Sequence, residues 1–127
     1  MTNKRILLIG GVHQLPRRLK EAGPSMVHVC DELEPQLRRH SFVANAPFKT
    51  VSLIFRFGNQ DIFDPEIGAV DKRLNELPVA ITFDLERLKQ MDRLELQNEF
   101  RRATIEVLCD VAANFDLPFE FLDAMRV

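Results

Sequence analysis

The sequence contains no tryptophan and no tyrosine, and it has only two cysteines in 127 residues. Two of the aromatic side chains on which single-stranded bases stack are therefore missing. Cys30 and Cys109 lie 79 positions apart in apolar surroundings, which suits buried, reduced thiols better than a disulfide framework. We therefore expect a protein of a reducing compartment, the cytoplasm.

Long hydrophobic runs are also missing. The longest, Ile6 to Val12, is seven residues, whereas a helix needs about 20 apolar residues to span a bilayer. No small-residue cleavage site follows this run, so it is not typical of a signal peptide. We expect a soluble protein with no membrane partner.

The composition is that of a globular protein, with 46% hydrophobic and 28% charged residues. No tract is polar enough to predict disorder. A chain of this length buries about two thirds of the surface that it exposes when unfolded. We therefore expect a single domain over residues 1–127.

Charge is unevenly distributed, although the net charge is only −2. Residues 1–60 hold nine Lys or Arg and four Asp or Glu, a net charge of +5, and residues 61–127 hold eight and fifteen, a net charge of −7. Such asymmetry is typical of a surface offered to a charged partner. Acidic outer faces of long solvated helices would produce it as well.

The N-terminal third predicts a strand, a helix and a second strand. Residues 4–9 are a largely apolar run that ends at Gly10-Gly11, as in a strand buried on both faces. Apolar residues then recur at helical spacing over 15–22, before Gly23-Pro24 ends the segment. We predict a strand over 26–30 and a loop over 31–47, with room for one helical turn after Pro35.

The centre of the chain alternates with a period of two. Residues 50–57 and 77–83 both follow this pattern and predict strands. Turns are predicted at 58–61 and at Asp64-Pro65. Residues 67–73 form a weaker strand that would pair with 77–83.

The C-terminal part predicts helices. Asp84 and Asp92 are suitable N-caps for a short helix to Met91 and a long one to about Phe115, with a last turn or two over 119–125. The long helix carries one apolar stripe that would pack on the sheet. The predicted fold class is α+β, with a mixed or antiparallel sheet of about four to five strands packed against two to three helices.

The clearest candidate for chemistry is a nucleotide site at Gly10-Gly11, with Asp31 after the second predicted strand. A dinucleotide fingerprint needs glycine at the positions held by Val12 and Leu15, whose side chains would crowd a phosphate. A tight turn between strand and helix explains the glycines equally well. A nucleotide-binding or small enzymatic domain remains an alternative.

Metal and nucleophile signals are weak. His28 and Cys30 would share one face of the predicted strand, but the other His and Cys residues show no ligand spacing. Serines occur at 25, 41 and 52, and no Gly-x-Ser-x-Gly motif surrounds them. We predict no cofactor, no metal and no catalytic residue, and hence a protein that is not an enzyme.

Nucleic-acid binding is a further alternative, because basic residues gather in the N-terminal half at Arg17, Arg18, Lys20, Arg38 and Arg39. The sequence pI of about 5.9 opposes it.

Acidic side chains gather in one predicted turn, at Asp61, Asp64 and Glu66. They suit a solvated loop, a protein-binding patch, or an acid and base pair. The spacing matches no calcium loop.

Four features from Phe48 onward form one layout: a strand ending Arg56-Phe57-Gly58, the acidic turn, the strand over 77–84, and a long helix closing with Ala112 to Pro118. In this layout the chain resembles the small immunity proteins encoded beside bacterial polymorphic and contact-dependent growth-inhibition toxins. The resemblance covers about 75 residues.

The resemblance implies a function by binding. Such proteins neutralise a cognate toxin domain, often a basic nuclease, in a one-to-one complex that occludes its active site or substrate surface. The acidic C-terminal half suits a basic partner. The candidate partner-binding residues are Asp61, Asp64, Glu66, Asp71 and Glu76.

Overall fold

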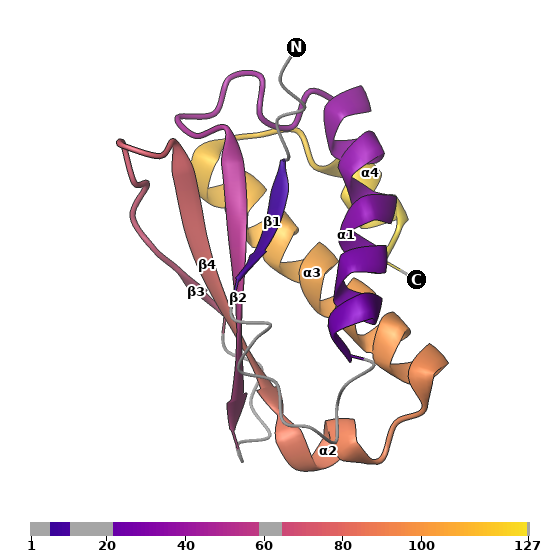
Figure 1. The fold of residues 1–127 in the computed structure, drawn as a ribbon. Coiled ribbons are helices and arrows are strands. Elements are labelled where there is room, and N and C mark those ends of the chain that lie inside the picture. Colours follow the sequence, from indigo (N-terminus) through magenta and orange to yellow (C-terminus); the bar gives the residue numbers. More distant parts are fainter. Residues whose placement is uncertain (1–5, 11–21, 59–64, 127) are drawn as a thin grey trace.

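The described part of the chain, residues 6–10, 22–58 and 65–126 of a computed structural model, forms a sheet with helices packed against it (Figure 1). The strands β1 (Leu7–Gly10), β2 (Thr50–Gly58), β4 (Glu76–Asp84) and β3 (Glu66–Ile67) are neighbours in that order. β1, β2 and β4 are parallel, and β3 is antiparallel to β4. The predicted α+β class with a mixed sheet is confirmed.

The two central strands follow their alternating sequences. Val51 pairs with Leu77 and Leu53 with Val79 in parallel register, and all four side chains are buried. The alternate positions of β2 are half-buried or exposed. The period-two pattern thus identified β2 and β4 correctly, because one face of each strand packs on a core.

The predicted weak strand over 67–73 exists in a shorter form. β3 pairs with β4 through Glu66 and Ile67, and an isolated bridge joins Asp71 to Glu76. Gly68 lies against β4 so closely that an added Cβ would stand 2.9 Å from Cγ of Pro78. The predicted pairing with the next strand is confirmed.

The N-terminal prediction is wrong between residues 23 and 39. Helix α1 (Ala22–Arg39) includes Gly23-Pro24, the segment 26–30 predicted as a strand and much of the segment 31–47 predicted as a loop. Its buried positions recur at helical spacing, at Ala22, Met26, Val29, Cys30, Leu33 and Leu37. The sequence signals for a break and a strand were local, whereas burial of this stripe against the sheet decides the structure. The helix predicted over 15–22 lies outside the described residues except for Ala22.

The C-terminal helices begin where the sequence predicts. Asp84 caps α2 (Leu85–Lys89) by accepting from the Glu86 N–H at 3.1 Å, and Asp92 caps α3 (Arg93–Phe115) by accepting from the Glu95 N–H at 2.8 Å. α3 ends at Asp116, which takes the left-handed conformation with φ 57° that glycine usually adopts there. α4 (Glu120–Ala124) is the predicted last turn.

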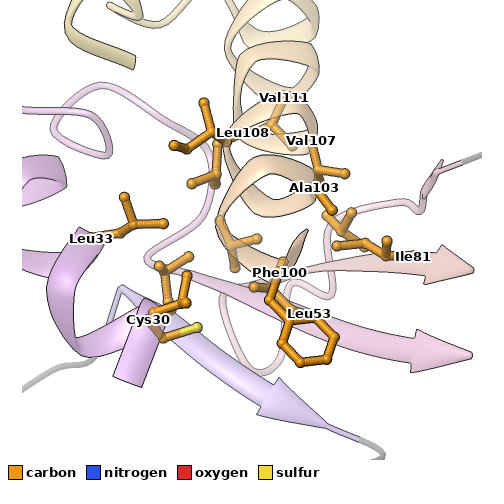
Figure 2. Packing of buried hydrophobic residues seen from close by; sticks show 14 of the residues in the cluster. Cys30, Leu33, Leu53, Ile81, Phe100, Ala103, Val107, Leu108 and Val111 are labelled. Atoms are coloured by element: carbon orange, nitrogen blue, oxygen red, sulfur yellow. The ribbon is translucent and has the colours of Figure 1, made fainter. Parts of the chain in front are cut away.

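The core lies between the sheet and the α1–α3 layer, which covers one face of the sheet (Figure 1). Phe100 of α3 is fully buried, with ring centroids 5.9 Å from Phe55 of β2 and 5.1 Å from Phe83 of β4. Figure 2 shows Phe100, Ala103 and Val107 on the side of α3 that meets the strands, with Cys30 and Leu33 of α1 beside them. The apolar stripe of α3 therefore holds helix and sheet together.

Replacement of Phe100 tests this packing. We expect Phe100→Ala to lower the free energy of unfolding by about 3–5 kcal/mol, because a cavity forms beside Phe55 and Phe83. Leu94→Ala is the matched control on the same helix, since Leu94 is 65% exposed, and it should change the value by less than about 0.5 kcal/mol. Urea denaturation measures both, and equal losses would contradict this packing.

Candidate partner-binding surface

Three of the five predicted contact residues lie on or beside the β3–β4 edge of the sheet. Glu66 is in β3, Glu76 begins β4, and Asp71 lies in the segment between them. Asp61 and Asp64 lie outside the described residues. The edge formed by Glu66, Asp71 and Glu76 is the acidic edge of the sheet.

Glu66 extends over the sheet face that points away from α1 and α3. Its carboxylate accepts from Nη1 of Arg56 on β2 at 3.2 Å, across the intervening strand β4. The two side chains are 68% and 56% exposed. Such an exposed pair contributes only about 0.2–1 kcal/mol to stability, so both groups stay available to a partner.

Asp71 organises the turn before β4. Its Oδ1 accepts from the backbone N–H groups of Arg73 at 2.9 Å and Leu74 at 3.4 Å, and its own N–H donates to the Glu76 carbonyl at 2.7 Å. Asn75 completes the turn with φ 54°. The turn therefore presents Leu74, 62% exposed, on a fixed backbone.

Glu66 and Glu76 stand too far apart to act as an acid and base pair, whereas Asp71 lies opposite Glu76. Glu66 is level with Ala80, four residues along β4 from Glu76, and a strand rises about 3.3 Å per residue. Their backbones are therefore roughly 13 Å apart. Among the described residues no group of three His, Cys, Asp or Glu side chains could hold a metal ion. The acidic edge is suited to contact with a protein.

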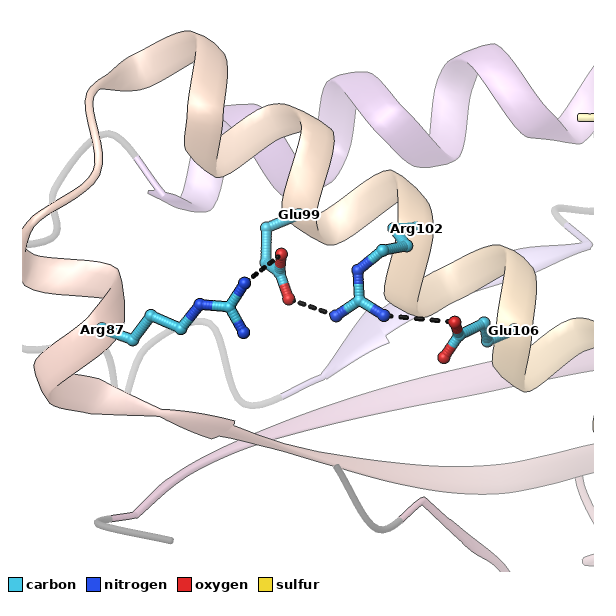
Figure 3. A network of polar contacts seen from close by, with 4 residues as sticks. All are labelled: Arg87, Glu99, Arg102 and Glu106. Atoms are coloured by element: carbon cyan, nitrogen blue, oxygen red, sulfur yellow. Dashed lines mark hydrogen bonds and ion pairs between the residues drawn. The ribbon is translucent and has the colours of Figure 1, made fainter. Parts of the chain in front are cut away.

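A second charged surface lies on the outer side of α3. Glu99 accepts from Nη2 of Arg102 at 2.5 Å and pairs with Nη2 of Arg87 at 3.5 Å, and Arg102 also donates to Glu106 at 3.1 Å (Figure 3). The hydrogen bond to Glu99, helped by the charges of Glu99 and Glu106, raises the pKa of Arg102 although partial burial opposes this. The network joins α2 to α3.

Beside this network lies a hollow of about 850 Å³ between α3 and the C-terminal segment. Its wall includes Met91, Glu95, Asn98, Ile105, Met125 and Arg126 in addition to members of the network. Three acidic and three basic side chains line it, so the hollow has no excess of one charge.

Several other sequence candidates take different places. His28 and Cys30 do not share a face, because they lie on α1, where positions two apart point in different directions; Cys30 is buried and His28 exposed. Asp31 is also in α1, so it does not follow a strand as a ribose-binding acid does. Gly10 ends β1, and Gly11 lies outside the described residues.

Arg38 and Arg39 are exposed in the last turn of α1, where their charges favour the negative end of the helix dipole. Arg17, Arg18 and Lys20 lie outside the described residues. Burial raises the pKa of the Cys109 thiol, which disfavours the nucleophilic thiolate. None of the described helices is long and apolar enough to cross a membrane.

Sequence reasoning missed the network on α3. Glu99, Arg102 and Glu106 stand three and four residues apart on one helix, a spacing that predicts ion pairs. Arg87 had no such signal, because it reaches Glu99 across the break between α2 and α3.

Glu99 should be the central member of this network, since its side chain is only 12% exposed and has two cationic partners. We expect Glu99→Gln to lower the free energy of unfolding by about 1 kcal/mol and the control Glu106→Gln by about 0.3 kcal/mol. Urea denaturation at low salt measures the difference. Equal losses from the two substitutions would show that Glu99 has no special role.

Comparison with known families gives a match along nearly the whole chain. The profile of the family described as Immunity protein 39 matches residues 1–126. No significant match was found among curated proteins or among solved structures. The resemblance to bacterial immunity proteins of toxin systems is confirmed, and the chain belongs to the Immunity protein 39 family.

Proposed function

We propose that this protein binds a cognate toxin domain in a one-to-one complex and neutralises it by occluding the toxin's active site or substrate surface, without catalysis of its own. The observation that carries the proposal is family membership over residues 1–126. The immunity protein would act in the cytoplasm of a cell that carries a contact-dependent or related polymorphic toxin system.

The chemistry of the described residues agrees with a binding role. Both cysteines are buried, Glu66 stands far from Glu76 along the sheet edge, and the charged side chains of the α3 network neutralise each other in ion pairs. These groups suit recognition of a protein surface.

We propose that the toxin contacts the acidic edge, formed by Glu66, Asp71 and Glu76, together with Asp61 and Asp64, and that it is a basic domain such as a nuclease. Leu74 lies between Asp71 and Glu76 along the chain with 62% of its surface exposed, and an apolar anchor beside charges is typical of a protein interface. Complementary charge would speed association and make it sensitive to salt.

The two alternatives have less support. The nucleotide-binding hypothesis relied on Asp31 following a strand, and Asp31 lies in a helix. The nucleic-acid hypothesis relied on a basic surface that includes Arg38 and Arg39. These two side chains lie in the last turn of α1, where they complement the negative end of the helix dipole. Neither arrangement favours an enzyme or a nucleic-acid-binding module over an inhibitor.

Co-expression with the protein domain encoded immediately upstream tests the proposal. Purification through a tag on the toxin domain alone should recover both chains, and light scattering should give the mass of a one-to-one complex. Recovery of the tagged domain without this chain, at low salt and with both chains folded, would contradict the proposal.

The acidic edge has its own test. Reversing all five acids to Lys should abolish the salt-sensitive part of binding, but it would also remove the Asp71 carboxylate that holds the turn. We therefore pair it with the double variant Glu66→Lys, Glu76→Lys and expect association on the order of tenfold slower.

The matched control lies on α3, where Glu95→Lys combined with Asp110→Lys makes the same change in net charge at exposed helical positions. Surface plasmon resonance at two salt concentrations compares the two double variants. If both slow association equally, only net charge matters and the acidic edge is not the contact.

A further inference from the structure

A pocket of about 360 Å³ lies between the N-terminal turns of α1 and α3, on the helix layer and away from the acidic edge. Its wall consists of Pro24, Ser25, His28, Arg93, Leu94 and Gln97. In Figure 1 these turns are at the end of the molecule toward which the parallel strands β1, β2 and β4 run.

The pocket wall contains a buried polar group that lacks a partner. Ser25 is only 3% exposed, and its hydroxyl oxygen has no hydrogen bond within the described part of the protein. A buried hydroxyl without a partner is unfavourable, because it has lost its hydrogen bonds to water and gained none in exchange, and such groups are rare in folded proteins. The oxygen is covered in the free chain, so a ligand would reach it through a change of the Ser25 rotamer, and the new hydrogen bond would remove this cost.

Each of the other polar side chains of the wall carries at least one hydrogen-bond donor. Arg93, His28 and Gln97 have no hydrogen bond or ion pair with any residue of the chain that the structure describes. The wall holds no carboxylate. The positive end of the α3 dipole, at Arg93, adds to the excess of donors.

Three carboxylates close to the pocket along the chain are engaged, whereas Glu95, two residues from Arg93 and from Gln97, is exposed, and Glu21 lies outside the described residues. Asp92 accepts from the Glu95 N–H as the cap of α3, both oxygens of Glu32 accept from Nη2 of Arg101, and Asp31 also has an interaction partner. Asp92 nevertheless carries a negative charge one residue from Arg93, so it should weaken the binding of an anion without preventing it.

From these contacts we propose that the pocket binds an oxyanion of a small molecule, a phosphate or a carboxylate. Arg93 supplies the charge, Ser25 and Gln97 donate hydrogen bonds, and the exposed side chain of Leu94 covers the organic part of the ligand. The site is separate from the proposed toxin contact, so either proposal can fail without the other.

NMR titration of the purified chain with inorganic phosphate, and separately with succinate, at constant ionic strength tests the site. We expect saturable shifts of the backbone amides of Arg93 and Leu94 and of the Gln97 side-chain amide. Tighter binding of phosphate identifies a phosphate ligand, and tighter binding of succinate a carboxylate ligand.

Three substitutions make the test specific. Arg93→Gln should raise the dissociation constant about tenfold, as expected for loss of a hydrogen bond to a charged group, whereas the charge-matched control Lys72→Gln on the sheet edge should leave it within about twofold. Asp92→Asn keeps a capping side chain and should tighten binding. The absence of saturable shifts with both anions, or equal weakening by Arg93→Gln and Lys72→Gln, would overturn the proposal.

Ser25→Ala tests whether the Ser25 hydroxyl binds the anion or has only a structural role. Removal of the unpartnered hydroxyl should raise the urea midpoint of the free chain and, at the same time, weaken anion binding. If the midpoint rises and binding is unchanged, Ser25 is not a ligand group and the proposed site is wrong.

Discussion

Packing of the apolar stripe of α3 on β2 and β4 determines where the other surfaces of the molecule lie. Phe100 contacts the Phe55 and Phe83 rings on the two central strands, and α1 packs beside α3 on the same sheet face. Because the long helices share one face, the polar side chains of β2, β3 and β4 project from the other face and from the edge. The position of the charged surfaces is therefore a consequence of which face of the sheet the helices cover.

The same arrangement of helices and sheet also separates two kinds of surface. The β3–β4 edge combines acids, an exposed leucine and a turn fixed by Asp71, which together suit contact with another protein. The junction of α1 and α3 instead holds hydrogen-bond donors and no carboxylate around the buried hydroxyl of Ser25. The family assignment does not distinguish between these two surfaces. The Arg87–Glu99–Arg102–Glu106 network joins α2 to α3, where its paired charges stabilise the fold.

Elements whose signals are local could be predicted from the sequence. Two kinds of signal depend only on residues close together in the sequence: the alternation around Leu53 and Val79, and the caps Asp84 and Asp92. They identified β2, β4, α2 and α3. α1 could not be predicted, because Val27 and Val29 favour a strand locally and Gly23-Pro24 resembles a helix end. Its burial against the sheet overrides these preferences. Likewise, the contact of Arg56 with Glu66 depends on the order of the strands in the sheet. The pocket at Ser25 depends on two helices lying side by side. The sequence pattern predicts neither arrangement.

If this member of the Immunity protein 39 family protects a cell by neutralising a toxin domain, protection should be visible as growth. The experiment is a survival assay of bacteria that express the toxin domain encoded upstream, with this chain or with its destabilised Phe100→Ala variant supplied from a second plasmid. Cells with the intact chain should grow, cells without it should die, and the variant should protect less. Death at the same rate with and without the folded chain would contradict a role in immunity.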